Sequence, residues 1–555
     1  MATGTKRRFY SSSSEAGGSA DYTIEKFVAG KDRFRVAPLN EIPTPWPFEQ
    51  AQAKASEKAN AILQNIKDDV HKICSGAGIN ATYITMQKIW RKNVPQGAKD
   101  CLLVETLDDD PARWLVAATS IKTLLAKTSF EEDECIVEIR NHRKMYSDIS
   151  FPISNDAQLL ACIREVQPKI RSIIDTRATD IWTSIAYHDR KSKFDKSAAK
   201  HCVIIYVRPG SSAMFEMIEQ LCVAAVKSAQ FPTVALSVEI LPGMVITSAE
   251  GDPRYTRCMF TSDTPKNGDS IGVKGVKPDS GTLGGWVILT HKTDGQVING
   301  IMTPYHVIAK VGSGDRAKND LEGIGFKGKK YCPKGAIVWP SEYDSDGTIE
   351  YCQESVRRGG DANSVAKSKK VLEILTSLKK SDGLGQVRFA SGNTRSDKNQ
   401  VMDWAIIQCK KFQNRPPIGP INQSQIPERI PELLYERNEH SCVKSFGPEL
   451  VAGDWVLKRG RTTENTHGEV NAVSREVKWE QKGKAVSYEL DIVGIGGDFG
   501  DRGDSGSWVI DSKFELVGML IAMDSGASGN HGIVTPIGSL LKDIEARTGY
   551  RLSLP

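Results

Sequence analysis

The texture of the sequence changes at about Gly251, and this change constrains the fold more than any other feature of the chain. From there on, short apolar runs alternate with Gly, Asp-Gly and Asn-Gly sequences, a pattern typical of an all-β domain with hairpin turns. Residues 286–290 and 297–302, which flank Asp294-Gly295, are expected to form one such hairpin. Residues 255–555 are therefore predicted to be a mainly β domain.

Two segments of this domain depart from the β pattern. Residues 364–380 and 537–547 carry helical signals, and Asn363 is a plausible N-cap for the first of them. We expect both to be helices.

The preceding segment, residues 46–250, repeats the order strand, helix, strand. The first set is expected at residues 101–105, 110–127 and 135–139, and the second at 202–207, 211–228 and 234–241. Two such sets predict a layered α/β domain. It contains no phosphate-binding glycine loop, metal-ligand spacing or nucleophile motif that would reveal a task.

Residues 1–45 lack periodicity and are rich in small, polar and charged residues, so we expect a disordered tail. The first ten residues are basic and are followed by serines, with no acid before Glu15, which are traits of a mitochondrial transit peptide. That localisation is the minority alternative. No apolar core of a secretory signal occurs near Met1.

Bulk composition narrows the class of protein further. The eleven cysteines are scattered singly, without a CxxC pair or a Cys/His cluster, so we expect a reducing, cytoplasmic compartment, no disulfides, no metal and no cofactor. The net charge of +5 is too weak to argue for nucleic acid. Apolar runs are too short to cross a membrane.

One candidate nucleophile is Ser505, within Gly503-Asp504-Ser505-Gly506-Ser507. The glycine two residues earlier lets the N–H groups of Gly503 and Ser505 face one point, where they could stabilise an oxyanion. Taken by itself, this sequence could equally be an ordinary turn.

A base and a carboxylate of matching chemistry lie upstream. His306 follows the end of an apolar strand, and Asp403 stands within what otherwise reads as a buried strand. Burying an isolated carboxylate costs several kcal/mol, so Asp403 should have a partner such as an imidazole. Singly, the two could be a satisfied core histidine and a strand-end carboxylate. Together with Ser505 they indicate a catalytic triad.

The order His, Asp, Ser in the motifs TxxH, DxAxx and GDSGS resembles the chymotrypsin-like (trypsin-like) serine peptidase superfamily, and most closely its intracellular, disulfide-free members in filamentous fungi. The resemblance implies a double β-barrel over residues 255–555. It also implies an endopeptidase that acts on a protein or peptide, with His306 as general base, Asp403 as its orienter, Ser505 as nucleophile, and Gly503 and Ser505 as the oxyanion hole.

The chain also departs from the secreted members. Val307 replaces a disulfide cysteine, and the 97-residue gap from His306 to Asp403 implies an insertion within residues 311–400. Ile521 stands where a serine often supports the aspartate, so Asp403 needs other hydrogen bonds. In secreted zymogens, a freed N-terminal ammonium pairs with the aspartate that corresponds to Asp504. Here that carboxylate needs an internal partner, for which Arg502 is one candidate.

Specificity and the alternatives stay open. Phe499 occupies the position where trypsins carry their specificity aspartate, and with Arg502 it is expected to line the substrate pocket, which favours apolar or small side chains. One alternative is a catalytically inactive protease-like scaffold or binding module, in which the N-terminal domain recognises a protein partner. Another is an esterase, although the usual G-x-S-x-G elbow is absent.

Overall fold

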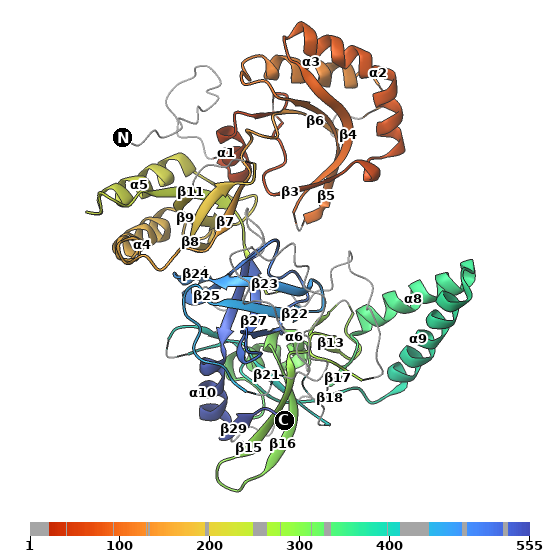
Figure 1. The fold of residues 1–555 in the computed structure, drawn as a ribbon, viewed down its shortest axis with the longest axis vertical. Coiled ribbons are helices and arrows are strands. Elements are labelled where there is room, and N and C mark those ends of the chain that lie inside the picture. The colour runs from red at the N-terminus through yellow and green to blue at the C-terminus, as the bar shows by residue number, and fades with distance from the viewer. Residues whose placement is uncertain are drawn as a thin grey trace. The chain divides into compact units, whose positions relative to one another are not determined.

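The computed structural model describes most of the chain, namely residues 22–39, 41–92, 94–128, 130, 134–194, 199–247, 264–277, 279–311, 313–326, 335–396, 398–410, 414, 443, 445–479, 486–524 and 531–555. These residues form two compact units. The first runs to Phe151 and continues over Asp156–Met244, and the second comprises Pro152–Asn155, Val245–Asp524 and the C-terminus (Figure 1).

The chain near its N-terminus is folded, so the prediction of a disordered tail over residues 1–45 was wrong for residues 22–39. Helix α1 (Ile24–Lys31) begins at an N-cap, Thr23, whose hydroxyl accepts from the N–H of Lys26. Its buried Phe27 ring lies 5.5 Å from that of Phe215. Its buried residues Ile24, Phe27 and Val28 follow the i, i+3, i+4 spacing of a helical face, but so short a helix has too few of them to stand out in the sequence. Residues 1–21 lie outside the described residues.

The first unit contains one module twice. Each copy runs strand, helix, two strands, helix, strand. The first copy is β3 (Phe48–Ala51), α2 (Glu57–Gly76), β4 (Ala81–Arg91), β5 (Val94–Thr106), α3 (Trp114–Leu125) and β6 (Cys135–Arg140). The second is β7 (Asp148–Phe151), α4 (Ala157–Arg177), β8 (Trp182–Ser192), β9 (Lys200–Val207), α5 (Phe215–Lys227) and β11 (Leu236–Pro242).

Strand pairing is also the same in the two copies. The first two pairs of neighbouring strands are antiparallel and the last pair is parallel, as in β3–β4, β4–β5 and β5–β6 and in β7–β8, β8–β9 and β9–β11. Short strands complete the unit: β2 (Arg35–Val36) joins β6, and β1 (Tyr22–Thr23) joins β10 (Ser212–Ala213). Identical order and pairing indicate an internal duplication, although the sequence pattern showed one strand-helix-strand set per copy.

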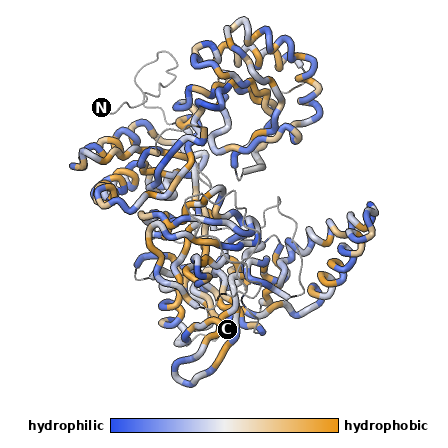
Figure 2. The backbone as a smooth tube through the Cα atoms, in the orientation of Figure 1, coloured by the Kyte–Doolittle hydropathy of each residue, from blue (hydrophilic) through white to orange (hydrophobic). Residues whose placement is uncertain are grey.

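Helices account for most differences from the sequence-based expectation in this unit. Helix α3 begins at Trp114 instead of Asp110, because the Asp110 carboxylate accepts from the N–H of Ala112 in a turn that precedes the helix. Helices α2 and α4 were not predicted. In α2 the buried face consists of about one residue per turn, a narrow apolar stripe that is visible as alternating colours in Figure 2.

The second unit begins with a mainly antiparallel sheet in the order β14-β13-β17-β18-β21-β16-β15-β29. Its strands are β13 (Ser270–Val273), β14 (Gly281–Thr282), β15 (Gly285–His291), β16 (Val297–Thr303), β17 (Ala336–Val338), β18 (Gly385–Ala390), β21 (Ala405–Cys409) and β29 (Tyr550–Ser553). The hairpin expected from residues 286–290 and 297–302 is confirmed as β15 and β16, which pair from Gly285↔Met302 to Thr290↔Val297.

The following strands close into a barrel. They are β22 (Trp455–Gly460), β23 (Glu464–Val470), β25 (Val486–Gly494), β26 (Trp508–Ile510), β27 (Leu516–Asp524) and β28 (His531–Pro536). The pairs β22–β23, β23–β25, β25–β28, β28–β27, β27–β26 and β26–β22 form a closed ring. Two further short strands join it: β24 (Arg475–Lys478) pairs with β25, and β12 (Val245–Ile246) pairs with Met523 and Asp524 of β27.

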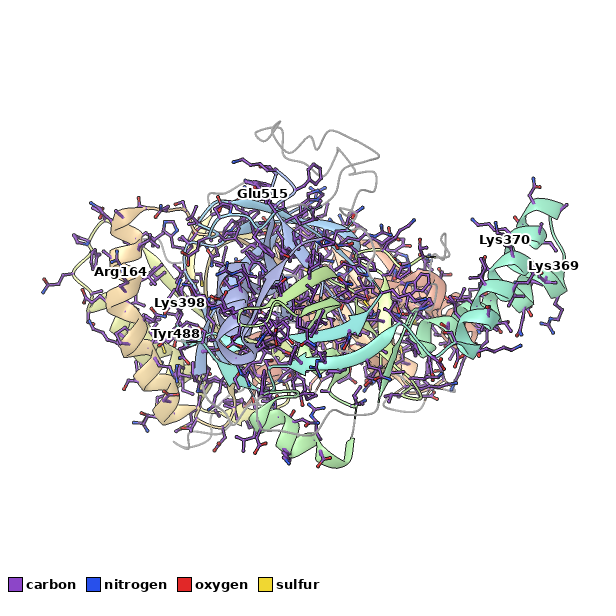
Figure 3. All side chains as sticks on the ribbon, turned by 90° about the horizontal axis from the view of Figure 1, so that it is seen from below. Arg164, Lys369, Lys370, Lys398, Tyr488 and Glu515 are labelled. Carbon is purple, nitrogen blue, oxygen red and sulfur yellow. The ribbon has the colours of Figure 1, made fainter. Side chains whose placement is uncertain are left out.

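The insertion predicted within residues 311–400 contains a helical hairpin. Helices α8 (Glu342–Arg358) and α9 (Ala362–Lys380) lie side by side between β17 and β18 and project away from the sheets of the second unit (Figures 1 and 3). Helix α9 confirms the helix expected at 364–380, but its N-cap is Asp361 instead of Asn363, because the Asp361 carboxylate accepts from the N–H of Ser364. Helix α8 is rich in polar residues and was not predicted.

The C-terminal helix, α10 (Ile537–Thr548), confirms the expected one, and β29 then joins the first sheet through β15. Eight described cysteines are free, and seven of these are buried; burial raises the pKa of Cys135 to about 12. None of the helices in the described ranges has the length and apolar character that a membrane crossing requires.

Candidate active site

His306 is fixed by the short helix that follows β16. Strand β16 ends at Thr303, and Pro304 precedes helix α6 (Tyr305–Ile308). The neighbours Tyr305 and Val307 are buried, so the turn is anchored on both sides of the histidine. The His306 side chain is 8% exposed, so the ring is almost fully buried.

Asp403 holds His306 at two points. It lies between β20 (Val401–Met402) and β21, and its side chain is fully buried. Oδ1 accepts the main-chain N–H of His306 at 3.0 Å, and Oδ2 lies 2.9 Å from Nδ1 of the ring. Because a carboxylate accepts, Nδ1 carries the proton and Nε2 is the basic nitrogen. The main-chain bond supplies support that Ile521 cannot give.

Ser505 lies in a loop that packs closely against the end of β16. Gly503 and Gly506 have φ values of 94° and 104°, which favour glycine. A Cβ on Gly506 would lie 2.2 Å from the carbonyl oxygen of Thr282 and 2.9 Å from Pro304 Cδ. Since Pro304 is two residues before His306, this contact brings the nucleophile loop to the histidine.

The hydrogen bond between Ser505 and His306 is not formed in this structure. Ser505 Oγ points to the carbonyl oxygen of Ile521 at 3.5 Å, a long contact. Nε2 of His306 is buried and has no hydrogen-bond partner among the described residues. The structure thus joins the first two candidate residues and places the third in the adjacent loop.

Two N–H groups of the nucleophile loop point to no protein acceptor. The N–H groups of Asp504, Gly506 and Ser507 donate to main-chain oxygens, whereas those of Gly503 and Ser505 have no acceptor in the described part of the chain. This alternation leaves available the two donors that the sequence predicts for an oxyanion hole.

Asp504, beside the nucleophile, is paired with Lys458 instead of Arg502. Both side chains are fully buried, with Lys458 Nζ 2.9 Å from Asp504 Oδ2. The carboxylate also accepts from the N–H groups of Thr462, Thr463 and Asp501 and from the hydroxyl of Thr463. The counter-ion of Asp504 is therefore an internal ammonium, that of Lys458.

The pKa values of both members of this pair are lowered, for different reasons. Burial disfavours the charged form of Asp504, but the Lys458 ammonium and the hydrogen bonds from Thr463 and Lys458 outweigh it, so the pKa of Asp504 lies below its usual value. Burial lowers the pKa of Lys458, and the attraction of Asp504 offsets part of that shift. The pair is thus held as an ion pair.

The two residues expected in the substrate pocket lie in different surroundings. Phe499 is buried in a core cluster with Val470, Ile492 and Leu520, and a Cβ on Gly532 would lie 2.3 Å from its ring. The main-chain oxygen of Arg502 accepts from the Thr462 hydroxyl. A pocket role for either side chain stays a prediction.

Sequence reasoning missed Lys458. Its signal is a lysine inside the buried strand β22, two residues before Gly460. Because a fully buried lysine is rare unless it is paired, this position could have indicated an internal partner for Asp504.

Comparisons with known proteins bear on this part of the chain. Residues 349–553 match the model of peptidase family S64. A comparison with curated proteins finds no match. Among solved structures, the chain is similar to protease A of Thermobifida fusca, at 12% identity over 52% of this chain and 98% of that one, with a TM-score of 0.27. It is likewise similar to the chymotrypsin of Cellulomonas bogoriensis, at 13% identity over 52% and 98%, with a TM-score of 0.27.

The match to a peptidase family over residues 349–553 agrees with the resemblance to peptidases that the motifs indicate. The narrower likeness to intracellular fungal members stays a prediction.

Replacing Lys458 with methionine should destabilise the second unit. The substitution leaves Asp504 buried without its counter-ion, which typically costs about 3–5 kcal/mol of unfolding free energy. Urea unfolding would measure the loss. The double variant K458M/D504N should recover part of it, because no unpaired charge remains. Equal stability of K458M and the unsubstituted protein would contradict the pairing.

Asp504 should also make stability depend on acid pH. Its pKa is lowered in the folded state, so its stabilising contribution is complete above the unfolded pKa of about 3.9 and is lost as pH falls towards the lower folded value. Unfolding free energy measured from about pH 6 to 3 should fall less steeply in D504N than in the unsubstituted protein. Parallel curves would show that Asp504 has no such role.

Proposed function

We propose that residues 255–555, which include the segment that matches peptidase family S64, work as a serine endopeptidase. The observation that carries the proposal is the two-point contact between Asp403 and His306, next to a loop whose Gly503 and Ser505 N–H groups have no acceptor in the described part. A structural histidine would not need its ring and its main chain fixed by the same buried carboxylate, with Nε2 left without a partner among the described residues.

In the proposed reaction, Ser505 Oγ first turns from Ile521 to Nε2 of His306. Nε2 takes the hydroxyl proton as Oγ bonds to the carbonyl carbon of the substrate, and the N–H groups of Gly503 and Ser505 stabilise the oxyanion. When the C–N bond breaks, His306 gives that proton to the leaving amine and an acyl-enzyme remains. Water then repeats the sequence, releases the acid and restores Ser505. No cofactor or metal takes part.

The proposed substrate is a protein or peptide with an apolar or small side chain before the cleaved bond. What supports this is that the position of the trypsin specificity aspartate holds Phe499, which offers no negative charge to a Lys or Arg side chain. We further propose that the enzyme is cytoplasmic and that the first unit serves to bind a protein partner.

A second function is an inactive protease-like scaffold. The observation that favours it is the open contact between Ser505 and His306, since Nε2 has no partner among the described residues. Long catalytic hydrogen bonds are common in proteins without substrate, so this geometry does not exclude activity. A covalent probe distinguishes the two readings.

A fluorophosphonate probe should label the purified full-length protein at Ser505. S505A should lose labelling and nearly all peptide hydrolysis, and H306A should lose nearly as much, because nucleophile and base act as one unit. Intact mass spectrometry and casein digestion would measure both. Absence of labelling would favour the inactive scaffold. Labelling accompanied by hydrolysis of esters but not of peptides would favour an esterase.

Asp403→Asn should lower kcat by about 10⁴-fold, because the amide cannot accept from Nδ1–H and the ring loses its correct tautomer. The main-chain bond to His306 has an acceptor in either side chain, so the fold should persist. Steady-state kinetics on a peptide substrate, with circular dichroism as the control for folding, would test this. Unchanged kcat would remove Asp403 from the mechanism.

A further inference from the structure

The projecting helical hairpin is fixed to the body of the second unit by the first turns of α8. Ser341 caps this helix and its hydroxyl accepts from the N–H of Asp344. Glu342 accepts from the N–H of Gly275, and Asp346 pairs with Lys277. These contacts hold the base of the hairpin, whereas Lys369 and Lys370 lie on its projecting part (Figure 3).

Unlike the carboxylates of Glu342 and Asp346, that of Asp344 is buried. It is 1% exposed and accepts from the hydroxyls of Ser280 and Ser341 at 2.7 and 3.0 Å. The guanidinium of Arg461 binds the same carboxylate, with Nε 2.9 Å from Oδ2 and Nη2 on Oδ1. The Tyr343 ring centre lies 5.8 Å from Arg461 Cζ. The first turn of α8 therefore binds the Arg461 guanidinium through the Asp344 carboxylate and the Tyr343 ring.

Arg461 in turn lies against the nucleophile loop. A Cβ on Gly503 would come within 3.1 Å of Arg461 Cδ and 2.7 Å of Thr462 Oγ1. Arg461 Nη1 donates to Thr462 Oγ1 at 3.1 Å, and that hydroxyl donates its hydrogen to the carbonyl oxygen of Arg502. The chain of contacts from the insertion thus ends on the peptide between Arg502 and Gly503.

That peptide determines where one oxyanion donor points. In a planar trans peptide the C=O and the following N–H point in opposite directions. Holding the Arg502 oxygen at Thr462 therefore directs the N–H of Gly503 away from Thr462. Gly503 has a φ of 94° and lacks a side chain that would resist rotation of the peptide. The orientation of this donor depends on its neighbours.

We propose that Asp344 is a positioning residue of the peptidase: by holding Arg461, it keeps the Arg502–Gly503 peptide in the orientation that aims the Gly503 N–H into the oxyanion hole. This inference rests on the proposed function and deepens it. It makes Asp344, in the first turn of α8, part of the apparatus that orients the proposed oxyanion donor.

The first test compares two isosteric substitutions on one helix. Asp344→Asn should lower kcat by about 10-fold or more, approaching the 10²–10³-fold that loss of an oxyanion donor costs, and should leave KM unchanged. Ser505 Oγ adds to the carbonyl carbon of a peptidyl trifluoromethyl ketone and gives a tetrahedral adduct that carries an oxyanion. The affinity for this compound should fall by the same factor as kcat. Asp346→Asn, whose carboxylate pairs with Lys277 and Lys379, should retain kcat within about twofold.

A second variant cuts the same path elsewhere and guards against misfolding of D344N. Thr462→Val removes the hydroxyl that links Arg461 to Arg502 and should reduce kcat and analogue affinity in the same way. The double variant D344N/T462V should lose no more kcat than the more impaired of the two single variants, because both substitutions act on the orientation of one peptide.

The outcomes separate this inference from the proposed function. Unchanged kcat in D344N or T462V, with active unsubstituted protein, would overturn the inference and leave the peptidase intact. Fully additive losses would also overturn it. Absence of hydrolysis and probe labelling in the unsubstituted protein would overturn both.

Discussion

The buried ion pair between Asp504 and Lys458 is the interaction on which the candidate site depends. Asp504 receives five hydrogen bonds, from Lys458, Thr462, Thr463 and Asp501, so the residue beside the nucleophile cannot move without exposing or stranding a charge. The Gly503 and Ser505 donors flank it. Strand β22 supplies Lys458, and the turn after that strand supplies the threonines, so the barrel itself orders the loop.

The candidate triad could be proposed from the sequence, whereas the partners of the residues around it could not. His306, Asp403 and Ser505 each stand in a short local pattern, namely a strand end, a carboxylate in an apolar run and a glycine-flanked serine. Lys458 and Asp344 act through contacts with residues 46 and 117 positions away. Such pairing leaves no local pattern that identifies the partner, although Lys458 itself stands out as a lysine inside an apolar strand. For the same reason Arg502 was the nearest cation in sequence but the wrong partner.

The fold shows the same division between local and distant information. Strands of the second unit were predictable because turns with Asp-Gly and alternating apolar residues are local signals, as in the hairpin of β15 and β16. Helix α1 was missed because Phe27 packs on Phe215, far along the chain. The duplication of the first unit was visible as a repeated order of elements, but the helices that complete each copy carry narrow apolar stripes.

The place of the insertion in the topology explains how it can reach the nucleophile loop. Helices α8 and α9 connect the paired strands β17 and β18. Strand β17 also pairs with β13, which pairs with β14. Thr282 of β14 donates its N–H to the oxygen of Ser505 and its hydroxyl to that of Gly503. The base of the α8–α9 hairpin and the strand under the nucleophile loop therefore belong to one edge of one sheet. The insertion follows β17, which is two strands away from β14, the strand that contacts the Ser505 loop. An insertion in the hairpin of β15 and β16 would instead separate the strand that leads to His306 from its partner.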